Sequence, residues 1–251
     1  MISKAKIKLI HSLETKKNRK NKGLFVAEGH KLVGELLDTG HVPQYLCATP
    51  EWHESNPSIH VDDIVSSEEL RQASLLKTPQ SVLALFALPR HTQPSPQQLA
   101  SHLSLALDGI QDPGNLGTIC RIADWFGIEH ILCSPDTVDI LNPKAVQATM
   151  GAISRIQIHY LPLAPYLKEI IASGTPVYGT FLNAPSIYQS PLSPNGIIVM
   201  GNEGKGISPD IEALVDKRLN IPNYPSDRLT TDSLNVAVAT AITCSEFRRR
   251  S

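Results

Sequence analysis

Polar side chains that could bind an anion gather after one predicted strand. The segment Asp108–Ile128 reads DGIQDPGNLGTICRIADWFGI and combines a glycine-rich turn with Asn115 and Arg121. A helix beginning near Gly117 would place Arg121 about one turn inside it and Asn115 just before it, so both could face one ligand. The free N–H groups of a helix start also attract anions. A capped helix with an ordinary surface arginine explains the same residues.

A second glycine-rich segment, Gly196–Ser208, reads GIIVMGNEGKGIS. An apolar strand followed by glycines around Glu203 and Lys205 predicts a sharp turn or a close backbone approach. The spacing of these glycines does not fit a Walker loop, and Pro209 stands where the dinucleotide fingerprint needs its last glycine. The segment therefore predicts a glycine loop that presents one carboxylate, Glu203.

The third segment, Asn220–Arg250, has a proline-marked loop and then a helix rich in small and β-branched residues. Asp232 or Ser233 is the predicted N-cap, with Asn235 close behind. A helix with such small side chains packs closely against a partner surface. Polar groups from three loops at one sheet edge indicate a site.

The elements that must position these loops alternate between strand and helix, which predicts an α/β fold with a mainly parallel sheet covered on both faces. Ligands of such sheets bind at the carboxyl ends of the strands. The predicted strands are Leu103–Leu107, His130–Cys133, Ile156–Tyr160, Val177–Leu182, Ile197–Met200 and Arg218–Ile221. The predicted helices are Gly117–Phe126, Pro143–Ile153, Leu163–Ser173, Ile211–Val215 and Leu234–Arg249.

A smaller α/β module precedes this region, and the proline- and glutamine-rich segment Pro89–Ser101 predicts an exposed linker. We therefore expect a first domain at 1–88, a linker at 89–101 and a second domain at 102–251. The module's predicted elements are a basic helix from Ser3 to about Asn21, strands Leu24–Ala27, Tyr45–Ala48 and Val82–Leu88, a helix His30–Asp38, and another opened by Ser66 or Ser67.

Charge is distributed unevenly along the 251 residues, whose formal net charge is −1. Residues 1–22 contain eight Lys or Arg and one acid, a net charge of +7, so the rest of the chain carries −8. Such asymmetry indicates a phosphate-rich partner or an acidic membrane surface. An ordinary solvated helix face would show the same charges.

Cysteine and histidine spacing argues against a disulfide framework and a metal site. The four cysteines are far apart with no C-x-x-C pair, and the nine histidines lack a ligand-like helical spacing. No apolar run approaches the roughly 18 residues of a membrane span, and the amino terminus lacks a signal-peptide core. These features predict a cytoplasmic protein without membrane association or bound metal.

The three segments resemble a known family. NLGTICR with its preceding Asp-Pro-Gly, VMGNEGKGIS, and IP followed by SLNVAVATAI are similar to the three signature motifs of the SpoU/TrmH class of SPOUT RNA methyltransferases. The resemblance spans about residues 103–250, in the family's order. GLFVAEGHKLVGELL and TPQSVLALF resemble the ribosomal-protein-like RNA-binding domain that precedes the catalytic domain in many members.

The resemblance implies a ribose 2'-O-methyltransferase that uses S-adenosylmethionine, acts on ribosomal or transfer RNA with rRNA favoured, and forms a homodimer through a trefoil-knotted carboxyl-terminal domain. The residues that would line the cofactor are Thr180, Gly201, Ile221 and Leu234. The residues that would form the catalytic and RNA-binding set are Asn115, Arg121, Glu203, Ser233 and Asn235. The chain departs from the family pattern between Ile221 and Ser233, where the loop is longer and contains Asn223-Tyr224-Pro225.

The residue types suit methyl transfer to a hydroxyl. An arginine side chain is ordinarily a protonated guanidinium and is therefore a poor candidate for the catalytic base, so Arg121 is expected to bind a neighbouring phosphate and to stabilise developing alkoxide charge. Asn115 and Glu203 would orient Arg121 and the ribose, while Ser233 and Asn235 would fix their loop and hydrogen-bond the substrate. Two alternatives are a non-catalytic RNA-binding protein that retains the fold and a nucleotide- or dinucleotide-dependent enzyme.

Overall fold

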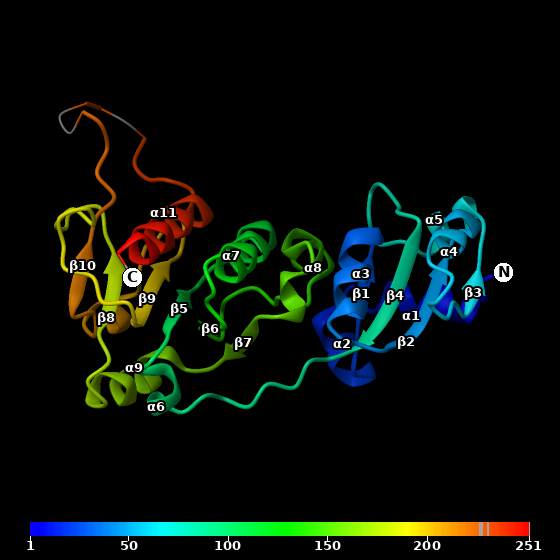
Figure 1. The fold of residues 1–251 in the computed structure, drawn as a ribbon, viewed down its shortest axis with the longest axis horizontal. Helices are drawn as coiled ribbons and strands as arrows, with labels where there is room; N and C mark the ends of the chain where they lie inside the picture. The colour runs from blue at the N-terminus through cyan, green and yellow to red at the C-terminus, as the bar shows by residue number, and fades with distance from the viewer. Residues whose placement is uncertain (226–227, 230, 251) are drawn as a thin grey trace. The chain divides into compact units, whose positions relative to one another are not determined.

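The computed structural model describes residues 1–225, 228–229 and 231–250, and Figure 1 labels its helices and strands. The chain divides into two compact units. Unit 1 comprises Met1–Arg90 and Asp139–Arg155, and unit 2 comprises His91–Val138 and Ile156–Ser251. The predicted limits assign residues 139–155 to the carboxyl-terminal domain, whereas the tertiary contacts of the structure group this segment with unit 1.

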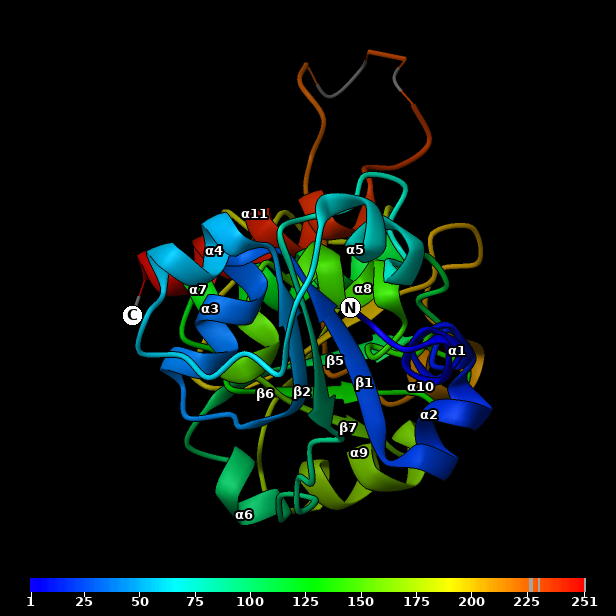
Figure 2. The same cartoon turned by 90° about the vertical axis from the view of Figure 1, so that its right-hand side faces the viewer.

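Unit 1 is built on a four-stranded sheet in the order β1-β4-β2-β3, with antiparallel pairs except for β2 and β3. Helices α1 and α3 lie on opposite faces of it (Figure 2). The strands are β1 (Leu24–Glu28), β2 (Pro43–Ala48), β3 (Asp63–Ile64) and β4 (Val82–Ala87). The helices before the linker are α1 (Lys4–Ser12), α2 (Lys16–Lys22), α3 (His30–Asp38), α4 (Pro50–Ser55) and α5 (Ser67–Ala73). Helix α4 and strand β3 were not predicted.

The basic amino-terminal segment is part of the unit 1 fold. It forms two helices rather than the single predicted one, because Thr15 caps α2 through a hydrogen bond to the N–H of Asn18. Leu13, between the helices, is fully buried in the core of unit 1. Arg19 is also buried and forms an ion pair with Asp139 at 2.7 Å. The positive charge therefore belongs to an ordered surface and not to a detachable arm.

The segment 139–155 contributes α8 (Pro143–Thr149) and a short 3-10 helix (Ala152–Ser154) to unit 1. Gly151 has a φ of 102°, and a Cβ there would lie only 2.5 Å from the Cβ of Glu35 on α3. Arg155 closes the same contact with an ion pair to Glu35 at 2.6 Å. Glycine is thus required where this segment meets α3.

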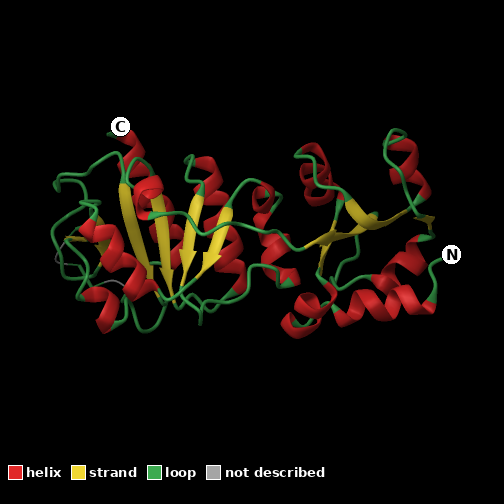
Figure 3. Cartoon of the chain, turned by 90° about the horizontal axis from the view of Figure 1, so that it is seen from below, coloured by secondary structure: helices red, strands yellow, loops and turns green. Residues whose placement is uncertain are grey.

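Unit 2 is built on a six-stranded, entirely parallel sheet in the order β10-β8-β9-β5-β6-β7 (Figure 1). Figure 3 shows its strands in yellow with helices in red around them. The predicted α/β fold with a mainly parallel sheet is confirmed. The strands are β5 (Leu103–Asp108), β6 (His130–Cys133), β7 (Gln157–Tyr160), β8 (Val177–Thr180), β9 (Gly196–Gly201) and β10 (Lys217–Leu219). The helices are α6 (Pro96–Leu99), α7 (Pro113–Trp125), α9 (Leu163–Ala172), α10 (Pro209–Glu212) and α11 (Val236–Arg249).

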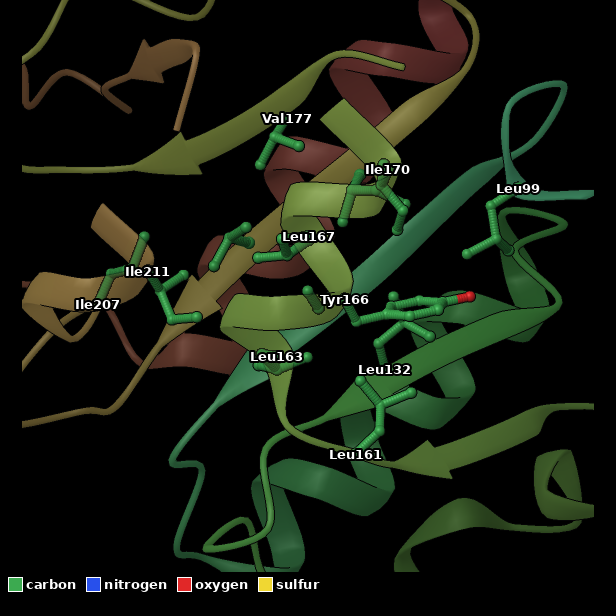
Figure 4. Packing of buried hydrophobic residues seen from close by; sticks show 13 residues of the cluster. Leu99, Leu132, Leu161, Leu163, Tyr166, Leu167, Ile170, Val177, Ile207 and Ile211 are labelled. Carbon is green, nitrogen blue, oxygen red and sulfur yellow. The ribbon is translucent and has the colours of Figure 1, made fainter. Parts of the chain in front are cut away.

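Helix α9 builds much of the apolar core of unit 2 (Figure 4). Leu163, Leu167 and Ile170 are buried against strand residues such as Val199. Leu99 of α6 joins this cluster and is fully buried. The prediction of an exposed linker at 89–101 is therefore wrong for its second half, because a capping box makes 96–99 helical and Leu99 anchors it.

Candidate active site

The first polar loop follows β5 and leads into α7. This helix begins at Pro113, because Asp112 caps it by accepting a hydrogen bond from the N–H of Asn115 at 2.7 Å. The predicted start near Gly117 is wrong. Asn115 and Arg121 both lie within the helix, so they are separated by about 9 Å along its axis and by about 120° around it.

Three of the predicted site residues form a chain of hydrogen bonds. The side-chain amide of Asn115 donates to Oε1 of Glu203 at 2.9 Å. The side-chain amide of Asn235 donates to Oδ1 of Asn115, also at 2.9 Å. The chain joins residues 115, 203 and 235, which stand in the three separate segments identified from the sequence.

Asn235 is also the N-cap of α11. Its Oδ1 accepts hydrogen bonds from the N–H groups of Ala237 and Val238 at 3.0 and 3.3 Å. The predicted cap at Asp232 or Ser233 is therefore wrong. Because the carbonyl of Asn235 faces the helix, its amide must face Asn115, and this orients the amide of Asn115 toward Glu203. Each donor in the chain thus meets an acceptor.

Asn202, which the sequence analysis did not single out, holds the turn that presents Glu203. Its Oδ1 accepts hydrogen bonds from the N–H groups of Gly204 and Lys205, at 2.9 and 3.0 Å. Its Nδ2 donates to the carbonyl of Gly109 in the first loop at 2.6 Å. Asparagine at the start of a glycine turn commonly forms such bonds, and this is the signal that could have found it.

Gly201 ends β9 in register with Asp108 of β5. A Cβ at Gly201 would lie 2.3 Å from backbone atoms of both Gly206 and Ile207. The close backbone approach predicted from the glycines of this segment therefore occurs between Gly201 and residues 206–207 of the same loop. The glycine at 201 is needed for the fold, whatever ligand binds beside it.

Arg121 is exposed, and within residues 1–225, 228–229 and 231–250 it makes no hydrogen bond or ion pair. It is therefore available to an external anion. Ser233 is exposed as well; its carbonyl accepts a 3.5 Å hydrogen bond from Thr231, and no hydrogen bond joins its side chain to the Asn115 chain among the described residues. The structure thus unites Asn115, Glu203 and Asn235 but leaves Arg121 and Ser233 separate from them.

The predicted cofactor residues follow three neighbouring strands. Thr180 ends β8, Gly201 ends β9, and Ile221 lies two residues beyond the end of β10. Thr180 Oγ1 lies 3.7 Å from Met200 Sδ. Ile221 is half-exposed, and Leu234, which directly precedes the cap of α11, is 49% exposed.

The long loop between Ile221 and Ser233 includes 226, 227 and 230, which lie outside the described residues. Its side chains at Tyr224 and Leu229 are almost fully exposed.

Among the described residues, no group of three or more His, Cys, Asp or Glu could hold a metal ion. No described helix is both long enough and apolar enough to span a membrane.

Residues 102–245 match the SpoU rRNA methylase family, and residues 4–84 match the MRM3-like substrate binding domain. The chain belongs to the SpoU family. The predicted resemblance to the SpoU/TrmH class is thus confirmed, and with it the prediction of a methyltransferase enzyme.

Relatives of this SpoU-family chain match it over almost its full length. It is 32% identical over 240 residues to the 23S rRNA (guanosine(2553)-2'-O)-methyltransferase RlmP of Bacillus subtilis, covering 94% of this chain and 93% of the relative. A TrmH-family structure from Porphyromonas gingivalis is 41% identical with a TM-score of 0.88, covering 100% of both chains. The AdoMet-bound rRNA methyltransferase of Sinorhizobium meliloti is 28% identical with a TM-score of 0.84, covering 100% of this chain and 96% of the other.

Proposed function

We propose that this SpoU-family enzyme transfers a methyl group from S-adenosylmethionine to a ribose 2'-hydroxyl of ribosomal RNA. The observation that carries the proposal is the chain Glu203–Asn115–Asn235, which joins all three motif segments in unit 2, where Arg121 remains free for an anion. The B. subtilis relative is named for 2'-O-methylation of 23S rRNA, and the S. meliloti structure contains AdoMet. Both support the same reaction and cofactor here.

The residues at the carboxyl edge of the sheet fit S-adenosylmethionine. Thr180, Gly201 and Ile221 follow three adjacent strands and offer backbone groups to a polar ligand, while Leu234 exposes apolar surface suited to an adenine ring. These four residues would hold the cofactor. When bound, it supplies an electrophilic methyl group on a sulfonium.

Arg121 is proposed to bind a phosphate of the RNA and to stabilise the negative charge that develops on the ribose oxygen. A guanidinium offers no acceptor for a proton, so the proton of the hydroxyl is proposed to pass to solvent as its oxygen bonds the methyl carbon and S-adenosylhomocysteine leaves. Asn115 and Glu203 hydrogen-bond each other and not Arg121, which supports the proposal that they fix the loops around the ribose. Oε2 of Glu203 makes no hydrogen bond within the described residues and can accept one from the ribose hydroxyl. Ser233 is proposed to contact the RNA.

Unit 2 is also proposed to form a homodimer and to contain a trefoil knot. Trp125 on α7 is 85% exposed and Val238 on α11 is 49% exposed, and these two helices pack against each other. Exposed apolar side chains of this kind are typical of a partner surface. A cytoplasmic location is proposed because all four cysteines are unpaired and buried, as in proteins of reducing compartments.

The substrate proposal is tested by transfer of labelled methyl groups to purified RNA. Ribosomal RNA and transfer RNA, each from cells that lack the gene, are offered separately with labelled S-adenosylmethionine. Label in rRNA alone supports the proposal. Label in tRNA alone would replace the proposed substrate, and label in neither, with cofactor binding intact, would contradict methyl transfer to these RNAs.

A further inference from the structure

The loop 181–190 follows directly on Thr180, and Asn220, directly after β10, holds its first half. The side-chain amide of Asn220 donates to the carbonyls of Phe181 and Leu182 at 3.0 and 2.6 Å. Its backbone N–H and C=O pair with two further loop residues at 2.8 Å each. Asn220 directly precedes Ile221, so this contact links the loop to a second proposed cofactor position.

Arg250 holds the second half of the same loop. Its guanidinium donates to the carbonyl of Ser190 at 2.7 Å and to that of Ile187 at 3.2 Å, and it also donates to the carbonyl of Tyr188. Ile187 is fully buried beneath these contacts. The rigid planar fork of arginine suits several acceptors at once, which the point charge of a lysine does not match.

Glu246 fixes Arg250 in this position. The Nε of Arg250 donates to Oε1 of Glu246 at 2.7 Å, and the carboxylate is only 5% exposed. Arg249 donates to the same carboxylate through two bonds of 2.8 Å. Arg249 is 65% exposed and makes no hydrogen bond to the loop within the described residues. Both arginines therefore bind Glu246, but only Arg250 also binds the loop.

We propose that Arg250 is a positioning residue for S-adenosylmethionine, because it fixes the loop 181–190 that continues from Thr180. This inference rests on the proposed function. A loop already held by Asn220 and Arg250 loses less conformational entropy when a ligand binds beside it. Helix α11 thus contributes to the site at both ends. Asn235 caps its start beside the proposed catalytic residues, and Arg250, directly after its last residue, binds the loop 181–190.

The test compares Arg250→Gln and Arg250→Lys with the matched control Arg249→Gln. Cofactor Kd is measured by calorimetry at a temperature where circular dichroism shows every variant folded. Arg250→Gln is expected to weaken the affinity about tenfold, Arg250→Lys by less, and Arg249→Gln by no more than about twofold. The KM for S-adenosylmethionine should rise with Kd while kcat changes little.

Hydrogen exchange of the loop 181–190, measured without cofactor, gives a readout that is independent of activity. Faster exchange in Arg250→Gln but not in Arg249→Gln supports the proposal. Equal Kd in the two glutamine variants, or equal exchange, would overturn it. If the wild-type protein binds no cofactor, the proposed function and this inference both fail. If the wild type binds the cofactor but the two glutamine variants behave alike, only this inference fails.

Discussion

Asn235 donates its side-chain amide to the side-chain carbonyl of Asn115 at 2.9 Å, while its own carbonyl caps helix α11. One side chain thereby fixes a helix start and orients the amide that bonds Glu203. The two asparagines are 120 residues apart in the chain. Their contact converts three separate loops into one arrangement that can face a ribose.

Asn235→Asp separates the two roles of this side chain. An aspartate oxygen caps α11 as well as asparagine does, but no donor remains to face the carbonyl of Asn115. If Asn115 turned its amide toward residue 235, its carbonyl would face the carboxylate of Glu203. We expect a loss of kcat of about 100-fold from the misplaced loops, with Tm nearly unchanged.

Asn235→Ala serves as the comparison, because it removes both bonds and should also cost about 1 kcal/mol of stability through the lost cap. Steady-state kinetics and thermal unfolding of the two variants provide the measurement. Full activity of Asn235→Asp would show that the amide donor has no part in the reaction.

Arg121→Ala should greatly slow methyl transfer without weakening the fold. The side chain is exposed and partnerless among the described residues, so its loss leaves no buried group unsatisfied. If it stabilises charge in the transition state, kcat should fall about 10²- to 10³-fold while cofactor Kd changes less than twofold. Lys168→Ala, an exposed cation on α9, is the control. A cofactor Kd that collapses in Arg121→Ala would instead assign Arg121 to cofactor binding.

The basic surface of unit 1 is tested by charge removal and not by truncation, because deleting residues 1–22 would take the buried Leu13 and Arg19 out of the fold. Lys17, Lys20 and Lys22 are exposed on α2. Replacing all three with glutamine should reduce the slope of log affinity for rRNA against log salt by about 2. Lys168→Gln should leave the slope unchanged. A triple variant with the wild-type slope would show that these lysines form only a solvated helix face.

The buried position of His159 predicts that the folded protein loses stability in acid. It faces His130 on β6, with ring nitrogens 3.3 Å apart, and the ring of His91, with centroids 5.9 Å apart. Burial, then the charges of His130 and His91, lowers the pKa of His159 from 6.5 to about 4. Between about pH 4 and pH 6.5 the unfolded chain therefore binds more protons than the folded chain. The stability that depends on neutral His159 is fully present above about pH 6.5 and is lost as the pH falls toward about 4.

Thermal unfolding at pH 7 and 4.5 measures this effect. The wild-type Tm should fall about 3 °C further than that of His159→Gln. His60→Gln, at a histidine whose side chain is 86% exposed, should behave as wild type. An equal fall for wild type and His159→Gln would remove His159 as a source of acid sensitivity.

Strand and helix alternation predicted the sheet of unit 2 well, because buried strands read as short apolar runs between turn residues. Strand His130–Cys133 and helix His30–Asp38 occur with the predicted bounds. Helix starts were less well predicted. The Asp-Pro-Gly before Asn115 is itself a cap-and-proline start signal, and its use would have placed α7 at Pro113.

The pairings within the site could not be predicted from spacing alone. Candidate residues followed from their types and their loops, but which amide meets which carbonyl depends on how the chain returns to the same sheet edge. The ion pair of Arg19 with Asp139 is another such contact, since nothing local to either residue indicates its partner. Clusters of this kind are determined by tertiary packing.

Methyl transfer to a ribose oxygen is tested most directly by the position of the transferred methyl group. The enzyme is incubated with methyl-deuterated S-adenosylmethionine and rRNA from cells lacking the gene, and the RNA is digested to nucleosides for mass spectrometry. We predict the deuterated methyl group on the ribose fragment of one nucleoside, and far less of it after the same incubation time with Arg121→Ala. Label on a base, or equal labelling by the Arg121 variant, would contradict the account.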